Sequence, residues 1–195
     1  MVEPGAGKPR VLFIEPQPFF TNRGSPFRAW ATVKALADFG YEVDLLVYPI
    51  GDDVSYPGVT LHRGMRLPGI RQVKVGPSWS KVALDLALFF KAAQLLRRRR
   101  FVAVHAIEES ALIALCLRRL FGVPYIMDMH SCMPEQLAAH PVLGRTVFMR
   151  LFLWAERLAL RRAAGVQTVS DAMSERARAI APHVPAVTVE DLPLE

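Results

Sequence analysis

Cysteine is scarce in this sequence, and long uninterrupted apolar runs are missing. The two cysteines, Cys116 and Cys132, fit neither a disulfide framework nor a metal-binding spacing, which favours a reducing, cytoplasmic compartment. The longest candidate membrane stretch, Val82 to Phe90, is interrupted by Asp85 and is too short to cross a bilayer. The polar, Pro- and Gly-rich start, Met1 to Arg10, lacks the pattern of a signal peptide.

Several motifs that would assign a function directly are also missing. The chain has no G-x-G-x-x-G and no Walker A lysine pattern, so a dinucleotide or P-loop site is poorly supported. It has no H-E-x-x-H and no paired C-x-x-C, so we expect no metal. The nucleophile elbow G-x-S-x-G is absent as well. A small Ser-His-Asp hydrolase stays open as an alternative through Ser170, although Thr168-Val-Ser-Asp171 is typical of a helix N-cap.

The composition is that of one globular domain, and its positive charge is unevenly distributed. The chain has 195 residues, of which 52% are hydrophobic and 22% charged, and a net charge of +6. Trp79 to Arg100 holds six basic residues and one acid, and Val142 to Arg162 holds five and one. The rest of the chain, with 13 basic and 16 acidic residues, is net negative. Two segments therefore carry the positive charge, which indicates an anionic surface or ligand as partner.

Short apolar runs alternate with longer amphipathic stretches along the whole chain. The runs predict strands at 10–15, 42–48, 59–62, 101–104, 125–129, 165–169 and 186–189. The stretches predict helices at 26–39, 79–100, 110–120, 142–162 and 171–180. This alternation predicts an α/β fold with one doubly wound, Rossmann-like parallel sheet over residues 1–195. Ligands of such sheets bind in the loops at the carboxyl ends of the strands. In this sequence those loops begin at Glu15, Pro49, His105, His130 and Ser170.

The first of these loops combines a glycine with a helix start. Gly24 permits close backbone approach, Ser25 is a good N-cap and Pro26 suits the first helical position. A strand, a Gly-containing loop and a helix N-terminus together can bind an anion such as a phosphate. An ordinary turn between strand and helix would have the same residues, so both interpretations stay open.

Two histidines stand at the ends of consecutive predicted strands and can converge in one crevice. A lone histidine is more often structural, which is the commoner expectation for His105. His130 has Asp128, Ser131 and Glu135 close to it in the sequence. Because Asp128 and His130 share a strand face, we expect the carboxylate to orient the imidazole. Its Nε2 would then hydrogen-bond a sugar hydroxyl.

The two basic segments combine cations with large apolar side chains. Trp79, Val82, Leu86, Phe90 and Ala93 line one face of the predicted helix 79–100. Such helices can lie on an anionic bilayer. Core packing is nevertheless the commoner use of most of this apolar surface. For the arginines at the end of the predicted helix, the plainer interpretation is a solvated helix end, where cations favour the helix dipole. RNA binding is a weaker alternative because no matching stacking surface accompanies the basic segments. The membrane-surface candidates are Trp79, Arg97, Arg98, Arg99, Arg100, Arg150, Arg157 and Arg161.

Together these features resemble the N-terminal domain of the family-4-type retaining glycosyltransferases of the GT-B fold. The motifs, in order along nearly the whole chain, are Val11-Leu-Phe-Ile14 before the Gly24 loop, Leu36-Ala-Asp-Phe-Gly-Tyr-Glu-Val-Asp-Leu-Leu46, Phe101-Val-Ala-Val-His105, Gly122-Val-Pro-Tyr-Ile-Met-Asp-Met-His130 and Gly165-Val-Gln-Thr-Val-Ser170. The sequence departs from many relatives in having Gly-Ser in place of Gly-Gly, and Glu190-Asp-Leu-Pro193 in place of Pro-Asn-Gly.

The resemblance implies transfer of a hexose from a nucleotide diphosphate sugar to a hydroxyl, with no metal and no further cofactor. Gly24 and Ser25 would lie near the donor diphosphate, and His130 would contact the donor sugar near the reacting centre. Arg28, His105, Asp128, Ser131 and Glu135 are the further donor- or acceptor-binding candidates. A C-terminal domain outside these residues would supply the nucleotide pocket, and many family members act on lipid-linked or envelope acceptors at the cytoplasmic membrane face. The alternative is a non-catalytic α/β module that binds a membrane or a partner.

Overall fold

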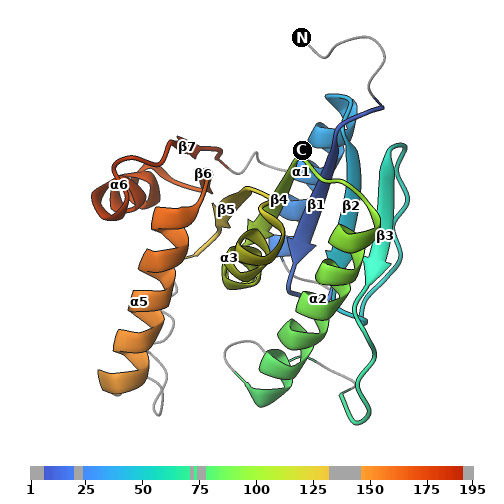
Figure 1. Ribbon diagram of the computed structural model, residues 1–195, viewed down its shortest axis with the longest axis horizontal. Coiled ribbons are helices and arrows are strands. Elements are labelled where there is room, and N and C mark those ends of the chain that lie inside the picture. The colour runs from blue at the N-terminus through green and yellow to red at the C-terminus, as the bar shows by residue number, and fades with distance from the viewer. Residues whose placement is uncertain (1–6, 20–23, 71–72, 74–77, 132–145, 191–195) are drawn as a thin grey trace.

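The computed structural model describes residues 7–19, 24–70, 73, 78–131 and 146–190, with backbone only for 24–25 and 146–149. Its centre is a parallel sheet of seven strands in the order β3-β2-β1-β4-β5-β6-β7 (Figure 1). The strands are β1 (Arg10–Glu15), β2 (Glu42–Val47), β3 (Val59–Arg63), β4 (Ala103–Ile107), β5 (Tyr125–Met129), β6 (Gly165–Thr168) and β7 (Ala186–Thr188). The helices are α1 (Gly24–Asp38), α2 (Trp79–Arg98), α3 (Ser110–Phe121), α5 (Thr146–Arg162) and α6 (Asp171–Ile180). The predicted Rossmann-like α/β fold is therefore confirmed.

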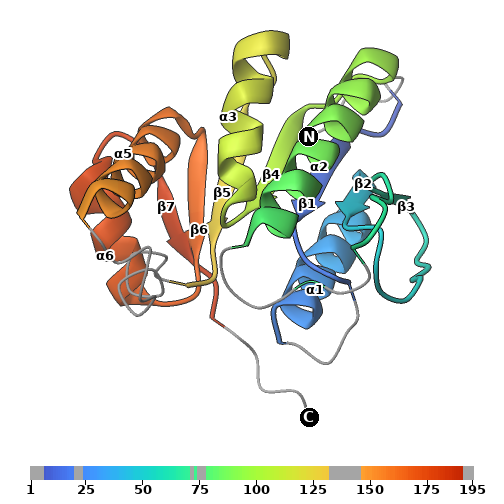
Figure 2. The same cartoon turned by 90° about the horizontal axis from the view of Figure 1, so that it is seen from below.

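Helices cover both faces of the sheet, as parallel strands require. Figure 2 shows α1 on one side of the sheet and α2 and α3 on the other. Alternating strand residues divide the core accordingly: Phe13, Leu45 and Ile107 belong to the cluster on the α1 side. Leu12, Leu46 and many others belong to the larger cluster on the opposite side. Since α1 contacts β1, β2 and β3, its cover lies over the first half of the sheet.

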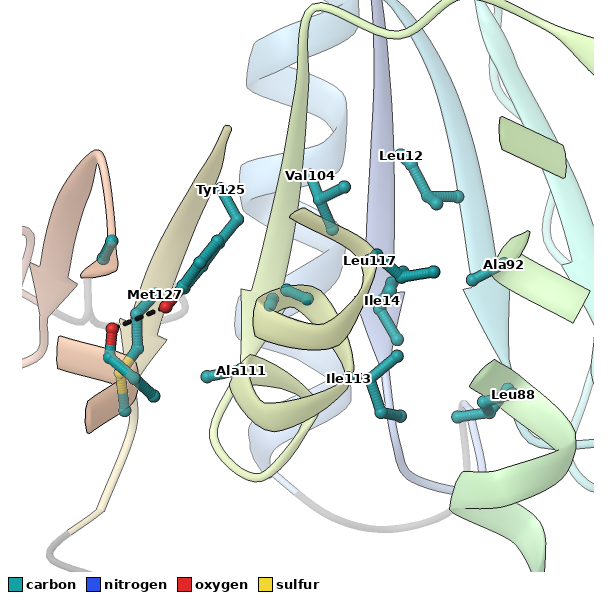
Figure 3. Packing of buried hydrophobic residues seen from close by; sticks show 14 of the residues in the cluster. Leu12, Ile14, Leu88, Ala92, Val104, Ala111, Ile113, Leu117, Tyr125 and Met127 are labelled. Carbon is teal, nitrogen blue, oxygen red and sulfur yellow. Dashed lines mark hydrogen bonds between the residues drawn. The ribbon is translucent and has the colours of Figure 1, made fainter. Parts of the chain in front are cut away.

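The larger cluster joins the strands to α2, α3 and α5 (Figure 3). Fully buried Leu12, Ile14 and Val104 of the sheet meet Leu88 of α2 and Leu117 of α3. Each such side chain contributes about 1.5–3 kcal/mol on burial. The hydroxyl of buried Tyr125 donates a hydrogen bond of 2.6 Å to the carbonyl of Ala159, so β5 is also tied to α5. This packing fixes the central strands against the helices on that face of the sheet.

One strand boundary differs from the prediction in a way that matters for function. The predicted strand 101–104 ends before His105, whereas β4 runs from Ala103 to Ile107 and has His105 at its centre. The apolar run stops at His105, but the hydrogen-bonded strand pairing continues through it. His105 pairs with Phe13 of β1 on one side and with Ile126 of β5 on the other. The expectation that His105 follows a strand was therefore wrong, because a buried polar partner lets the strand continue through it. The other boundaries agree with the prediction to within two residues, except that residues 142–145 of the predicted helix 142–162 lie outside the described part and α5 begins at Thr146.

The face that α2 turns to the sheet also differs from the prediction. Its buried residues include Leu84, Leu88 and Leu95. Trp79 and Phe90 belong to the apolar face for which core packing was the commoner expectation, and they are 89% and 57% exposed. The exposure of Trp79 agrees with its place among the membrane-surface candidates. The helix is apolar on two opposite sides, so its periodicity could not show which side faces inward. On α1, likewise, Val33 is buried whereas Phe27 is 45% exposed.

Candidate functional site

A buried carboxylate, Asp128, lies at the centre of a polar cluster near the carboxyl ends of β4, β5 and β6. Its Oδ2 is 3.0 Å from Nε2 of His105 and 3.2 Å from Nε2 of His130. The side-chain amide of Gln167 donates to the same oxygen at 3.2 Å. Among the described residues, the other oxygen, Oδ1, has no hydrogen-bond partner and is buried. The carboxylate thus joins side chains from three neighbouring strands.

The strand register explains why these side chains meet. Asp128 pairs with Ile107 of β4 and with Gln167 of β6. His105 lies two residues before Ile107 and therefore points to the same face, as every second residue of a strand does. The residue before Asp128 on β5, Met127, points to the opposite face of the sheet, into the larger core cluster. The prediction placed Asp128 and His130 on one face, and the structure confirms this, but it missed Gln167, whose only sequence signal is a polar residue inside an apolar run.

His105 is held on both sides. Its ring stacks on Phe13 with the ring centroids 4.5 Å apart and an interplanar angle of 8°. It is 6% exposed, so only a small part of it reaches solvent. With one nitrogen on Asp128 and a face on Phe13, this histidine orients and supports the carboxylate. Its geometry favours the structural role that a lone histidine most often has.

His130 lies one residue beyond β5, where the strand opens into the next loop. Its side chain is 6% exposed, and Nε2 faces Oδ2 of Asp128. We expected Nε2 to meet a sugar hydroxyl, and this stays a prediction; in the structure this buried nitrogen lies 3.2 Å from Oδ2 of Asp128.

The electrostatics keep Asp128 ionised. Burial by itself would raise the pKa of this carboxyl group, but hydrogen bonds from His105 and His130 outweigh it and lower the pKa far below its usual range. A carboxylate that stays charged across the physiological range is a constant acceptor for both imidazoles. The cluster is thus preorganised before any ligand arrives.

Glu108 connects the end of β4 to the end of β5. It has a positive φ of 47°, which no other described residue except glycine has. In this conformation its amide donates to the carbonyl of Asp128 at 2.9 Å, and its carboxylate accepts from the Ser131 hydroxyl at 2.5 Å. The pKa of Glu108 is raised, because the effect of burial outweighs the hydrogen bond from Ser131, which acts to lower it. Ser131, predicted as a ligand-binding residue, therefore lies beside the cluster with Glu108 as its partner.

The start of α1 lies at the same edge of the sheet as the cluster. Gly24 begins the helix, and Arg28 in its second turn donates from Nη2 to the carbonyl of Val189 at 2.5 Å. Val189 follows β7, so this bond joins segments 161 residues apart and brings the chain after β7 to the start of α1. Gly24 opens the helix after β1 and His130 follows β5, so both belong to connections that leave the carboxyl ends of parallel strands. The side chain of Ser25 and the whole of Glu135 lie outside the described residues.

The membrane-surface candidates lie on α2, its C-terminal end and α5. Trp79, Arg97, Arg98, Arg100, Arg150, Arg157 and Arg161 are all exposed. Arg99 is exposed too, but its Nη1 donates to buried Asp44 at 2.9 Å, so part of its charge is used inside the fold. None of the described helices is long and apolar enough to span a bilayer. In the described part of the chain, no group of three or more His, Cys, Asp or Glu residues has the arrangement of a metal site.

Comparison with known families assigns this architecture. The model of the glycosyl transferase 4-like domain matches residues 23–194. The chain belongs to this family. The glycosyl transferase 4-like domain thus comprises the whole cluster described above, from Gly24 to Val189. Comparison with curated proteins found no match.

Solved structures of glycosyltransferases share the fold of this glycosyl transferase 4-like domain. Sucrose-phosphate synthase from Thermosynechococcus elongatus is similar with a TM-score of 0.69 and 17% identity, over 94% of this chain and 48% of that one. UGT89C1 of Arabidopsis thaliana, complexed with UDP-L-rhamnose, is similar with a TM-score of 0.63 and 16% identity, over 96% and 50%. LpCGTa in complex with UDP is similar with a TM-score of 0.58 and 14% identity, over 96% and 55%.

The chain therefore spans about half the length of these solved structures. The predicted resemblance to the N-terminal domain of a GT-B glycosyltransferase is confirmed by the family match and by the fold. At these identities the structural likeness establishes the fold alone.

Proposed function

We propose that this chain is the acceptor-side half of a glycosyltransferase that moves a hexose from a nucleotide diphosphate sugar to a hydroxyl group, with retention of the anomeric configuration. The observation that carries the proposal is the arrangement of His130 on Asp128 at the carboxyl edge of a glycosyltransferase-family sheet. Ligands of parallel α/β sheets bind at this edge. A second domain, C-terminal to Glu195, supplies the nucleotide pocket and closes the cleft.

His130 is the catalytic residue in this proposal. Asp128 orients the imidazole, and the imidazole hydrogen-bonds a hydroxyl of the donor sugar. An imidazole fixed in this way costs little reorganisation when charge develops at the sugar. The buried carboxylate behind it also stabilises positive charge on the ring. The reaction needs no metal and no further cofactor, because the diphosphate leaving group is held by backbone amides and cations.

The start of α1 takes the diphosphate side of the donor. The N-terminus of a helix presents unpaired amides and a positive dipole end, which favour a phosphate. Gly24 allows close approach of the ligand, and Arg28 lies in the next turn. His105, Asp128 and Ser131 shape the floor of the site around the sugar and the acceptor. The acceptor is a lipid-linked or envelope glycan at the cytoplasmic face of a membrane.

The test uses the full-length protein, including whatever follows Glu195, and measures nucleoside diphosphate release from UDP-, GDP- and ADP-sugars. We expect His130→Ala to lower kcat about a hundredfold, as the loss of a transition-state hydrogen bond does. His183→Ala is the matched control, because this exposed histidine bonds to the carbonyl of Arg161, away from the Asp128 cluster, and should leave kcat unchanged. The 195-residue chain alone should bind nucleotide sugar weakly and transfer nothing.

Two results would contradict the proposal. Wild-type turnover by the His130→Ala enzyme would remove the histidine from the chemistry. A product with inverted anomeric configuration would exclude the retaining reaction.

A further inference from the structure

The solvent side of α2 carries an apolar stripe that nothing in the described fold covers. Trp79, Val82, Leu86 and Phe90 are 89%, 58%, 56% and 57% exposed. They recur at intervals of three and four residues, so they lie on one side of the helix along about 16 Å of its length. The opposite side holds Leu84, Leu88 and Leu95, which pack into the core. Four large apolar side chains in line exceed the single exposed residues that are normal on a soluble surface.

A second exposed stripe runs along α5 and mixes apolar and cationic side chains. Arg150, Trp154, Arg157 and Arg161 are all exposed and recur every three or four residues. Trp154 is 61% exposed, and Leu151 beside it is 60% exposed. A shallow surface hollow is lined by these arginines together with Leu153, Trp154 and Leu158. The other side of α5 is buried at Ala159 and Leu160.

The two stripes belong to one layer of helices. α3 lies between α2 and α5 and contacts both, on the side of the sheet opposite α1 (Figures 1 and 2). α3 adds exposed Leu120, Arg118 and Arg119. The layer therefore presents tryptophans, aliphatic side chains and arginines together on its outer side.

Acidic side chains are absent from that outer side among the described residues. The three helices contain only two acids, Asp85 and Glu156. Asp85 accepts from the Tyr48 hydroxyl at 2.5 Å, and Glu156 is 6% exposed and accepts from Arg176 at 2.6 Å. Arginines at the ends of the helices are explained by the helix dipole, but Arg150 and Arg157 stand in the early and middle turns of α5, where the dipole gives no reason for them.

We propose that the α2–α3–α5 layer docks on an anionic lipid bilayer. Trp79, Leu86, Phe90 and Trp154 enter the boundary between headgroups and acyl chains, and Arg150 and Arg157 contact anionic headgroups. Interfacial helices bind by this combination of apolar insertion and cationic attraction. A second copy of the chain would bring two arginine-rich faces together, and a nucleic acid would leave the aliphatic part of the α2 stripe in water. The inference is independent of the sugar-transfer proposal, because it needs no nucleotide sugar.

The test is flotation of the 195-residue chain with two kinds of vesicle, phosphatidylcholine alone and phosphatidylcholine mixed with phosphatidylglycerol. We expect binding only to the anionic vesicles, and weaker binding when NaCl rises from about 0.1 M to about 0.5 M. The double variant Arg150→Glu/Arg157→Glu should lower the partition coefficient more than about tenfold, since each basic side chain near an anionic surface is worth roughly fivefold. Arg150→Lys/Arg157→Lys keeps the charge and should retain binding.

A second variant tests the apolar part of the surface. Trp79→Ser should weaken binding severalfold, and the loss should persist at high salt because insertion is not screened. Lys34→Glu/Arg66→Glu is the matched control, with the same change in net charge at sites outside the helical layer, and should bind like wild type.

Three results would overturn the inference. The first is equal binding to both kinds of vesicle, and the second is an equal loss in the Lys34/Arg66 control. The third is a wild-type chain that stays unbound and elutes as a dimer in gel filtration, which would assign the layer to a second copy.

Discussion

His105 of β4 and Asp128 of β5 face each other across the sheet, with 3.0 Å between Nε2 and Oδ2. The same oxygen also receives Gln167 of β6 and faces His130 beyond β5. One buried carboxylate thus cross-links the three strands whose carboxyl ends form the candidate site. His105 supports the carboxylate, and His130 is the residue placed to meet a ligand. The sequence did not show this difference, because each histidine directly follows a predicted strand.

The supporting role of His105 predicts a stability effect. His105→Ala removes the ring stacked on Phe13 and leaves Asp128 with one donor fewer in a buried site. We expect the free energy of unfolding to fall by about 3 kcal/mol. Urea unfolding at pH 7 measures it, with His183→Ala, an exposed histidine, as the control. A loss below about 1 kcal/mol would show that the stack and the hydrogen bond contribute little.

A second buried carboxylate, Asp44, predicts acid sensitivity. Its oxygens contact Arg10, His62 and Arg99 beneath the end of α2. Burial acts to raise the pKa of Asp44, but the hydrogen bonds from His62 and Arg10 outweigh it, so the pKa is lowered. A carboxyl group whose folded pKa is lowered stabilises the fold above its unfolded pKa of about 4 and loses that contribution as the pH falls further.

Asp44→Asn should therefore be less stable than wild type by about 2–3 kcal/mol at pH 7, and the difference should shrink below pH 4. Urea titrations at a series of pH values between about 3 and 7 measure it. Asp53→Asn is the control, because Asp53 also pairs with an arginine, Arg63, but is 84% exposed. A pH-independent difference for Asp44→Asn would argue against the ion-pair cluster.

Asp85 predicts the opposite pH dependence. Burial raises its pKa to about 7, Glu109 adds to the rise, and the Tyr48 hydroxyl and Lys81 only partly offset it. A carboxyl group with a raised folded pKa stabilises the fold when protonated and loses that contribution as the pH rises from about 4 through 7. Asn in its place cannot ionise and still accepts from Tyr48. Asp85→Asn should therefore gain up to about 3 kcal/mol relative to wild type between pH 5 and 8.

Thermal unfolding of both proteins across that pH range is the measurement. A constant Tm difference across the whole range would show that Asp85 titrates normally.

Gly51 predicts a strict backbone requirement in the loop after β2. It has φ +114°, and a Cβ there would lie 1.9 Å from the carbonyl oxygen of Phe19. This contact belongs to the bridge that ties the loop after β1 to the loop after β2, through hydrogen bonds of Phe19 to Ile50 and Asp52. Gly51→Ala should lower the free energy of unfolding by about 3 kcal/mol or more, because both the conformation and the space forbid a side chain.

Gly69→Ala is the matched control for this prediction. Gly69 has a similar positive φ of +83°, but a Cβ at this position would meet no described atom within 4 Å. We expect a loss of about 1 kcal/mol there, from conformational strain alone. Equal losses at both glycines, measured by urea unfolding, would mean that the Phe19 contact carries no cost.

Much of the fold could be predicted because each element has a clear local pattern. β1, β5 and α6 begin and end where the pattern places them, since apolar runs and turn residues decide where regular hydrogen bonding can start and stop. The end of β4 could not be predicted, because His105 is polar in sequence and buried in the fold. Its burial depends on Phe13 and Asp128, which come from other strands.

The candidate site was predicted in part for the same reason. Asp128 near the end of β5 and His130 just beyond it stand two residues apart, so their shared face follows from continued strand geometry. Gln167 and Glu108 were missed because their roles depend on register and on a positive φ, which no local pattern encodes. The ring nitrogen that faces Asp128 is likewise set by contacts in three dimensions.

The amino-acid sequence by itself determined the order of strands and helices, the excess of positive charge on two helices and the resemblance to a glycosyltransferase domain. Local preferences of the chain decide these properties, and each can be seen within a few turns or one strand. Only the tertiary structure decided which side of α2 packs on the sheet, and it turned Trp79 and Phe90 to solvent. It also decided that one carboxylate serves two histidines. Both outcomes depend on contacts between residues far apart in sequence, where burial and charge pairing outweigh local preference.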